Sequence, residues 1–201
     1  MPRLTLLLPE TRRFAGAPLP ASLAPAFGRA DRATGGSGEE AQLARHFRLL
    51  PDRWSQAALT RAADAGIDDA TPHAWLRADP AYIRPDINGA RLLAIGNTLG
   101  IGQADVDALL PALRPLFGDS GFILDAPHPS RWYLRLPREA KLPAFASPQD
   151  ALGEDVFDHD AFATSRDVPE ARRWRVLLSE AQVVLHNHPH NAMRAAAGKV
   201  P

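Results

Sequence analysis

The chain has 201 residues, of which 45% are hydrophobic and 23% are charged, a composition that suits one globular domain with a small appendage. Lysine and arginine together number 23, as do aspartate and glutamate, so the chain lacks the basic excess typical of nonspecific nucleic-acid binding. The absence of cysteine excludes disulfides, thiolate catalysis and thiolate zinc sites.

The sequence also shows no targeting or membrane segment. The apolar run near the N-terminus, residues 4–8, is too short for a signal peptide. No stretch approaches the roughly 18 apolar residues that a membrane-spanning helix needs. We therefore expect a soluble, cytoplasmic protein that has neither a membrane nor a nucleic acid as its partner.

Residues 1–38 are predicted to form an N-terminal strand followed by a flexible segment. Leu4 to Leu8 is a short apolar run closed by Pro9, a pattern typical of a buried strand. The following residues up to Gly38 are rich in proline, alanine and glycine, which is the composition of a linker. The remaining residues, 39–201, are expected to form a single α+β domain that is truncated at its C-terminal end, because the chain stops directly after its most ligand-like segment.

Two helices and two strands are predicted in the first half of this domain. Residues 39–50 carry apolar side chains on one helical face, and residues 52–65 form a second helix that ends at Gly66. Residues 74–78 alternate like a strand, and residues 91–96 form a second strand candidate.

The next elements are a helix over residues 103–117 and strands over residues 122–124 and 131–136. In the last strand, alternate side chains point to opposite faces of the sheet: Trp132, Leu134 and Leu136 to one, Arg131, Tyr133 and Arg135 to the other. Residues 74–136 therefore predict a β-β-α-β-β core, in which one helix covers a small mixed or antiparallel sheet. With additional N-terminal and C-terminal helices, the fold class is α+β.

The C-terminal part is predicted to contain an acidic, irregular segment over residues 150–169 and a long helix over residues 171–186. One face of that helix is apolar and should pack against the core: Trp174, Leu177, Leu178, Ala181, Val184 and Leu185. The helix runs directly into residues 186–191, where three imidazoles and two amides gather. This segment is the strongest candidate for a ligand site in the chain.

Pro189 disfavours a helical conformation at His188 and suits the first position of a new helix. His188 would then cap a short helix over residues 189–197 that is stopped by a glycine. The free N–H groups at its start attract anions, and Arg194 lies near enough to assist a phosphate or carboxylate. The alternative is a plain corner between two helices, in which the histidines and Asn191 cap backbone groups. Such capping is the commoner role of these residue types.

A metal site in the same segment is not predicted. His186, His188 and His190 would converge only on a strand, and Pro189 interrupts a helix that could bring the outer two together. No acidic ligand is adjacent to them. We identify no metal or other cofactor and no catalytic residue.

A second constellation surrounds a proline turn. His128 and Arg131 bracket this turn, and an arginine at the first position of a strand can offer two parallel N–H donors to an oxyanion. The alternative is a solvated loop with Trp132 as a core anchor, since single histidines and arginines are common in loops.

A third set consists of Arg77, Arg84 and Arg91, which could line one edge as an anion patch. A solvated face is the simpler interpretation. Asp79 and Asp86 lie beside prolines, where aspartate often does no more than initiate a turn.

Three stretches carry a family resemblance: residues 75–86, 125–137 and 179–201. The last contains the pattern HP-x-N-x-x-R-x-x-x-G-K, which runs from His188 to Lys199. Together the three resemble bacterial regulatory proteins of the RpfE type, which are often described as cofactor-independent phosphoglycerate-mutase-like. The resemblance is weak before residue 50 and extends well from residue 52 onward. The HP-x-N pattern is similar to a stretch of the archaeal-type mutases.

Those mutases use a phosphorylated serine and two divalent metals held by Asp and His, and none of these can be placed in this sequence. The resemblance therefore implies regulation rather than catalysis, with recognition of an anionic, phosphorylated small acid. The ligand-binding residues that we expect are His188, Asn191 and Arg194, with His128 and Arg131 as a second wall. The alternatives are a phosphoglycerate mutase or related phosphatase, and a module that binds a protein partner.

Overall fold

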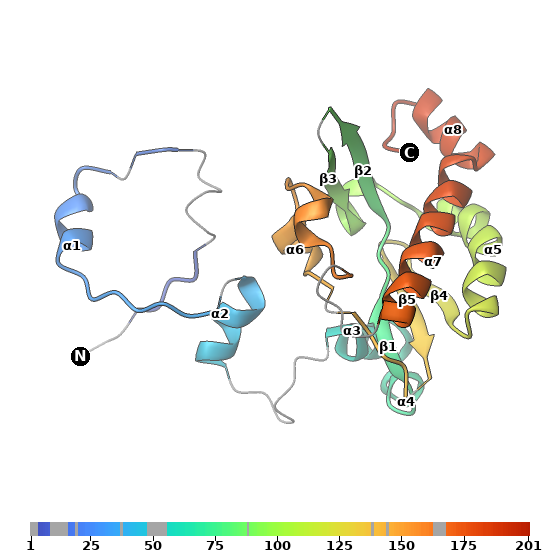
Figure 1. Cartoon of the computed structure of the whole chain (residues 1–201), viewed down its shortest axis with the longest axis horizontal. Helices are drawn as coiled ribbons and strands as arrows, with labels where there is room; N and C mark the ends of the chain where they lie inside the picture. Colours follow the sequence, from blue (N-terminus) through green and yellow to red (C-terminus); the bar gives the residue numbers. More distant parts are fainter. Residues whose placement is uncertain are drawn as a thin grey trace. The chain divides into compact units, whose positions relative to one another are not determined.

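The computed structural model describes residues 4–8, 16–18, 20–36, 38–47, 56–87, 89–137, 139–143, 145–162 and 168–201. The chain divides into two units, Met1–Trp54 and Ser55–Pro201 (Figure 1). The described residues of the first unit include two short helices, α1 (Ala24–Gly28) and α2 (Glu39–His46).

The run from Leu4 to Leu8 is exposed, and it forms neither a helix nor a strand. An isolated strand has no partner for its N–H and C=O groups except water, so an apolar run alone does not make one. The prediction of a buried strand at the N-terminus was therefore wrong.

The two helices predicted between residues 39 and 65 are present where the chain is described. α2 ends at His46 because Phe47 adopts an extended conformation, and predicted residues 48–50 lie outside the described residues. α3 spans Gln56–Ala65, and predicted residues 52–55 lie outside the described residues. Gly66 follows α3 with φ of 96°, a conformation that favours glycine, and leads into α4 (Ile67–Ala70).

The strands of the second unit form two antiparallel sheets. β1 (Ala74–Arg77), β5 (Arg131–Leu136) and β4 (Ile123–His128) make a three-stranded sheet in the order β1-β5-β4. β2 (Ala81–Asp86) and β3 (Gly89–Ile95) make a separate hairpin. The predicted α+β class with small antiparallel sheet structure is thus confirmed, although the predicted strands belong to two sheets rather than one.

β2 was not predicted, because its prolines and aspartates suggested turns. Pro85 lies near the end of the hairpin, opposite Ala90. Proline cannot donate a ladder hydrogen bond, but it is tolerated in an edge strand such as β2, whose described neighbour is β3 alone. The 3-10 helix η2 (Gly96–Leu99) follows β3 and leads toward α5.

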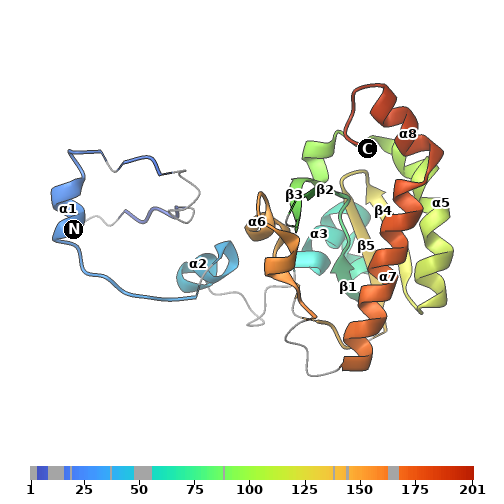
Figure 2. The ribbon, with the colours of Figure 1, turned by 45° about the horizontal axis from the view of Figure 1, so that its top comes forward.

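The main core lies between the three-stranded sheet and two long helices, α5 (Gln103–Asp119) and α7 (Val168–His186). Trp132, Leu134 and Leu136 of β5 belong to this core, as their alternation predicted. Buried helical residues complete it: Val106, Leu109, Leu110, Leu113 and Phe117 from α5, with Trp174, Leu177 and Ala181 from α7. Figure 2 shows α7 and α3 on opposite sides of this sheet, so α3 covers the polar face of β5.

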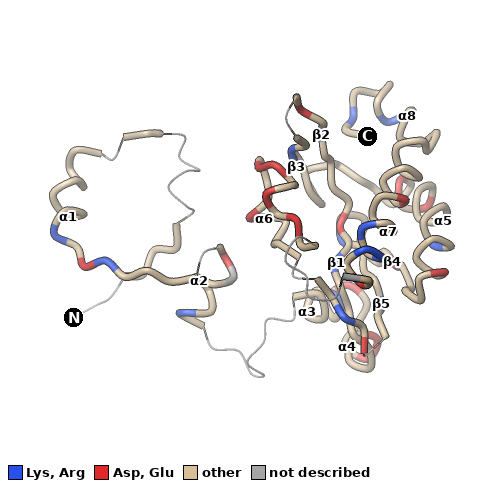
Figure 3. The backbone as a smooth tube through the Cα atoms, in the orientation of Figure 1, with Lys and Arg blue, Asp and Glu red and all other residues tan. Residues whose placement is uncertain are grey.

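The acidic segment that was predicted to be irregular contains two short helices, α6 (Pro148–Ala151) and η3 (Val156–His159). It runs along the outer edge of β3, where the Leu92 N–H donates to the Glu154 carbonyl oxygen at 3.2 Å. Figure 3 shows its acidic residues gathered beside β3. The segment thereby pairs backbone groups that a free sheet edge would expose.

α8 (Pro189–Ala196) begins as predicted, with His188 in an extended conformation at the cap and Pro189 in the first turn. Gly198 follows the helix with φ of 72°. No helix in the described part of the chain combines the length and the apolar character that crossing a bilayer requires.

Candidate functional site

The first candidate site lies at the corner between α7 and α8. Nδ1 of His188 accepts a hydrogen bond from the His190 N–H at 3.2 Å, so His188 caps α8. The buried Asn191 side chain donates from Nδ2 to the Leu185 carbonyl oxygen at 2.8 Å. Both side chains therefore bind backbone groups of the corner itself, which is the capping role that the sequence left open as the alternative.

Arg194, the cation of this segment, is only 5% exposed. Its Nε donates to the Val200 carbonyl oxygen at 3.1 Å, and its Nη2 donates to the carbonyl oxygens of Leu99 and Val200 at 2.9 Å each. Its Nη1 lies 2.7 Å from Oδ2 of Asp105 at the start of α5. All three guanidinium nitrogens thus contact protein groups, and the side chain joins α8 to η2, to α5 and to the last residues.

The carboxylate of Asp105 contacts three groups at this corner. It accepts from the Gly102 N–H at 2.8 Å and lies 2.7 Å from Nε2 of His190, in addition to contacting Arg194. Burial alone would raise the pKa of Asp105, but these donors outweigh burial and lower the pKa to about 2. The corner therefore contains its own anion, beside the guanidinium that the predicted ligand would approach.

Sequence reasoning did not identify Asp105. The spacing of Gly102 and Asp105 at the start of a helix is a signal for capping, and Asp105 does accept from the Gly102 N–H. Its contacts with His190 and Arg194 are tertiary, and no local pattern indicates them.

The second candidate site lies on the β4–β5 hairpin, where His128 and Arg131 are directly opposite each other. Directly paired residues of antiparallel strands point to the same face of the sheet. Nε of Arg131 donates to Oδ2 of Asp64 on α3 at 2.7 Å, and its Nη2 contacts the other carboxylate oxygen. The buried Tyr133 hydroxyl donates to the same carboxylate at 2.6 Å. These hydrogen bonds, led by those from Arg131, lower the pKa of Asp64 to about 2.

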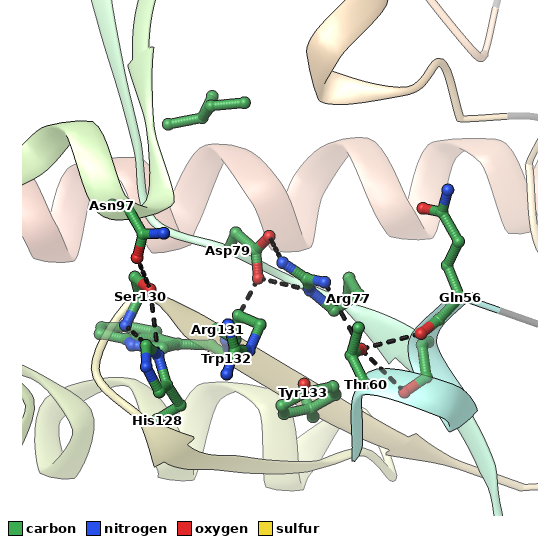
Figure 4. A network of polar contacts seen from close by, with 12 residues as sticks. Gln56, Thr60, Arg77, Asp79, Asn97, His128, Ser130, Arg131, Trp132 and Tyr133 are labelled. Atoms are coloured by element: carbon green, nitrogen blue, oxygen red, sulfur yellow. Dashed lines mark hydrogen bonds and ion pairs between the residues drawn. The ribbon is translucent and has the colours of Figure 1, made fainter. Parts of the chain in front are cut away.

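The His128 ring is held by the turn that follows it (Figure 4). Its Nδ1 accepts from the Ser130 N–H at 3.3 Å and lies 3.0 Å from Ser130 Oγ. When one nitrogen of a neutral imidazole accepts a hydrogen bond, the other carries the proton, which here is Nε2. The buried Ser130 hydroxyl also donates to Oδ1 of Asn97 in η2, which lies on the other side of Ser130 from His128 in Figure 4.

Three nitrogen donors around this turn have no hydrogen-bond partner among the described residues: Nε2 of His128, Nη1 of Arg131 and Nδ2 of Asn97. They belong to β4, β5 and η2. Ser130, in the turn between β4 and β5, links the hairpin to Asn97 of η2, and Asp64 of α3 holds Arg131. The Arg131 side chain is 29% exposed and Asn97 is exposed, so a small molecule can reach them. Such a set can donate hydrogen bonds to the oxygens of an anion.

The three arginines of the suggested anion patch lie in different surroundings. Arg84 and Arg91 are cross-strand partners in the β2–β3 hairpin. Arg77 belongs to β1 in the other sheet, where its Nε donates to Oδ1 of Asp79 at 2.8 Å (Figure 4). Asp79, which was expected only to initiate a turn, also accepts from the Trp132 N–H at 3.2 Å. The structure thus divides the three arginines between two sheets.

A further cation, Arg61 of α3, is buried on the polar face of the three-stranded sheet. Its Nε donates to Oδ2 of Asp69 at 2.5 Å, its Nη1 contacts Asp125 of β4, and its guanidinium lies 4.4 Å from the ring centroid of Trp75. Burial opposes its charge, but the two carboxylates outweigh burial and raise the pKa of Arg61. Beside the hairpin site, the charge of Arg61 is therefore already balanced by Asp69 and Asp125.

Within the described ranges, no three side chains of the metal-binding types are arranged to hold an ion. The chain gave no significant match to a family model, to a curated protein sequence or to a solved structure.

Proposed function

We propose that this is a cytoplasmic regulatory protein of the RpfE type that binds a small phosphorylated acid at the β4–β5 hairpin. The observation that carries the proposal is the cross-strand pair of His128 and Arg131, each of which keeps a nitrogen donor that no other described residue accepts. Asn97, which Ser130 links to His128, would supply the third donor through its Nδ2. Internal contacts hold each of these side chains, so a ligand has little side-chain motion to restrict when it binds.

The chemistry of the three donors favours an anion with several oxygens. An imidazole N–H, a guanidinium and a carboxamide all match the acceptor oxygens of phosphate and carboxylate groups. Asp64 already holds two nitrogens of Arg131 and offsets part of its charge. We therefore expect modest affinity, so that occupancy follows the concentration of the metabolite, as a regulatory protein requires.

The ligand would thus bind at the β4–β5 hairpin and not at the α7–α8 corner. His188, Asn191 and Arg194 then have a structural role, because protein groups already engage their side chains. The two regions remain connected through η2, since Asn97 contacts the hairpin and the Leu99 carbonyl accepts from Arg194. A ligand that orders Asn97 should therefore also stabilise the corner.

Isothermal titration calorimetry of the full chain with 3-phosphoglycerate, and separately with inorganic phosphate, tests this site. His128→Ala and Asn97→Ala should each weaken 3-phosphoglycerate binding about tenfold, since a hydrogen bond to a charged group contributes roughly 1.5–3 kcal/mol. His186→Ala is the matched control because His186 is an exposed histidine at the end of α7, and it should bind as the wild type does. No binding by the wild type, or unchanged affinity in His128→Ala, would exclude the hairpin as the site.

A further inference from the structure

The outer face of α7 carries apolar side chains that the core does not use. Pro169, Val176 and Val183 follow one another at intervals of seven residues, which places them on one face of the helix. Val176 is 49% exposed and Val183 is 59% exposed. Other residues of the same helix, such as Trp174 and Leu177, face the core. α7 therefore carries a second apolar stripe beside the one that packs within the second unit, and Leu177 borders both.

A hollow of about 340 Å³ adjoins this outer face. Its lining includes Pro169 and Val176 of α7 and Ser120 at the end of α5. The face thus combines an apolar ridge with a neighbouring hollow.

Two charged residues flank the centre of this face symmetrically. Arg172 precedes Val176 by four residues, and Glu180 follows it by four. Both are exposed, and neither forms an ion pair with another described residue. They are too far apart to pair with each other, because eight residues of a helix span about 12 Å. Arg173 also lines the hollow, but it contacts Glu170 and the Ser120 carbonyl oxygen of its own chain. Arg172 and Glu180 therefore present one positive and one negative charge at equal distances from the apolar centre of the face.

We propose that this face binds a second copy of the chain, with the two α7 helices antiparallel and a twofold axis at Val176. Residues equidistant from Val176 then lie opposite each other, so that Arg172 of each copy meets Glu180 of the other. Pro169 of each copy likewise meets Val183 of the other. Because the interface is isologous, both charge contacts and both apolar contacts form together.

The charge pattern identifies the occupant and its direction. A parallel arrangement of two α7 helices would place like charges opposite each other, which disfavours pairing. An unrelated partner has no reason to match charges that are symmetric about Val176, whereas a second copy matches them automatically. The surface therefore fits a dimer of this chain.

The absence of cysteine from the chain makes a direct test possible. In helices packed about 8–10 Å apart, Cα atoms that face each other at the axis are roughly 3.5–5.5 Å apart, a range that overlaps the separation a disulfide bridges. Val176→Cys in the full chain should therefore form a covalent dimer on mild oxidation, seen by nonreducing electrophoresis. Gln182→Cys is the matched control, since Gln182 is exposed on α7 but turned away from this face, and it should stay uncrosslinked.

The charge pattern gives a second test, read by sedimentation equilibrium. The wild type should show twice the 21.8 kDa mass of one chain. Arg172→Glu and Glu180→Arg should each weaken the dimer roughly tenfold or more, because each replaces two attractive contacts by two repulsive ones. The double variant Arg172→Glu/Glu180→Arg should restore the wild-type affinity. Gln182→Glu changes the charge away from this face and should leave the affinity unchanged.

Three outcomes would overturn the proposal. The first is a monomeric wild type, the second is a dimer that Val176→Cys does not crosslink, and the third is a double charge variant that stays as weak as the single ones. The substituted side chains are exposed, so circular dichroism of each variant should match the wild type and exclude unfolding as the cause.

Discussion

Arg194 and Asp105 lie 2.7 Å apart, from Nη1 to Oδ2, and this contact joins α8 to the start of α5. The Arg194 side chain is 4% exposed and the Asp105 side chain 13%. Because both charges have lost most of their hydration, each is stabilised by its attraction to the other. The arginine of the HP-x-N-x-x-R pattern is therefore one half of an internal ion pair in this fold.

Arg194→Ala should lower the free energy of unfolding by about 3–5 kcal/mol, because it leaves the Asp105 carboxylate buried without its cation. Urea unfolding followed by circular dichroism measures the change. Lys199→Ala removes an exposed cation from the same end of the chain and should cost less than about 0.5 kcal/mol. A loss in Arg194→Ala as small as that of the control would contradict the structural role of the pair.

Coupling between the two residues can be measured in the same experiment. In a double-mutant cycle, Asp105→Asn/Arg194→Ala should lose less stability than the sum of the two single variants, by about 1–3 kcal/mol. Additive losses would mean that the two side chains act independently despite their contact.

Stability should depend on pH through Asp64, whose side chain is 5% exposed. Its pKa falls from 3.8 to about 2 in the folded protein, chiefly because Arg131 donates to the carboxylate. A carboxyl with a lower pKa in the folded state stabilises the fold while ionised, so its contribution is complete above about pH 4 and is lost as the pH falls toward about 2. The shift corresponds to about 2 kcal/mol.

Urea unfolding between about pH 5 and about pH 2.5 checks this sign. The wild type should lose stability across that range, whereas Asp64→Asn should be less stable at the upper end and lose less on acidification. Some slope should remain in the variant, because Asp105 also has a pKa lowered to about 2. Identical slopes for the two proteins would show that Asp64 does not titrate as expected.

Tyr133→Phe should cost about 1–2 kcal/mol of unfolding free energy, because it removes a buried hydrogen bond and keeps the ring. The Tyr133 hydroxyl is fully buried and donates to Asp64 at 2.6 Å. The only other tyrosine, Tyr82 of β2, is half-buried, and Tyr82→Phe serves as the control with an expected change near zero. Thermal unfolding compares the two variants, and equal midpoints would contradict the role of the hydroxyl.

Ser130→Ala should weaken 3-phosphoglycerate binding several-fold while lowering stability by about 1 kcal/mol, because the Ser130 hydroxyl contacts both His128 and Asn97. This prediction rests on the proposed hairpin site, and calorimetry measures the affinity. Ser147→Ala removes a serine hydroxyl whose partner is Gln149, and it should leave the affinity unchanged. Ligand affinity unaffected by Ser130→Ala would mean that the hydroxyl does not position the donors.

Local features of this fold followed from local patterns. The cap at His188 could be predicted because Pro189 restricts the residue before it and suits a first helical turn. The two faces of β5 could be predicted because side chains alternate along any strand. β2 could not, since its proline and aspartates are compatible with either a turn or an edge strand, and only pairing with β3 decides between them.

The candidate sites likewise combine features that the local sequence predicts with contacts that only the folded chain makes. The sequence could name five candidates because they gather beside prolines at two predicted turns: His128, Arg131, His188, Asn191 and Arg194. The sequence by itself determined the cap of α8, the two faces of β5 and which polar residues are candidates, since these depend on near neighbours along the chain. Only the tertiary structure decided that Asp105 engages Arg194 and that Asp64 engages Arg131, because residues far apart in the chain meet only after folding. Those pairings decide which nitrogen donors already have an acceptor within the protein and which are left to bind a ligand.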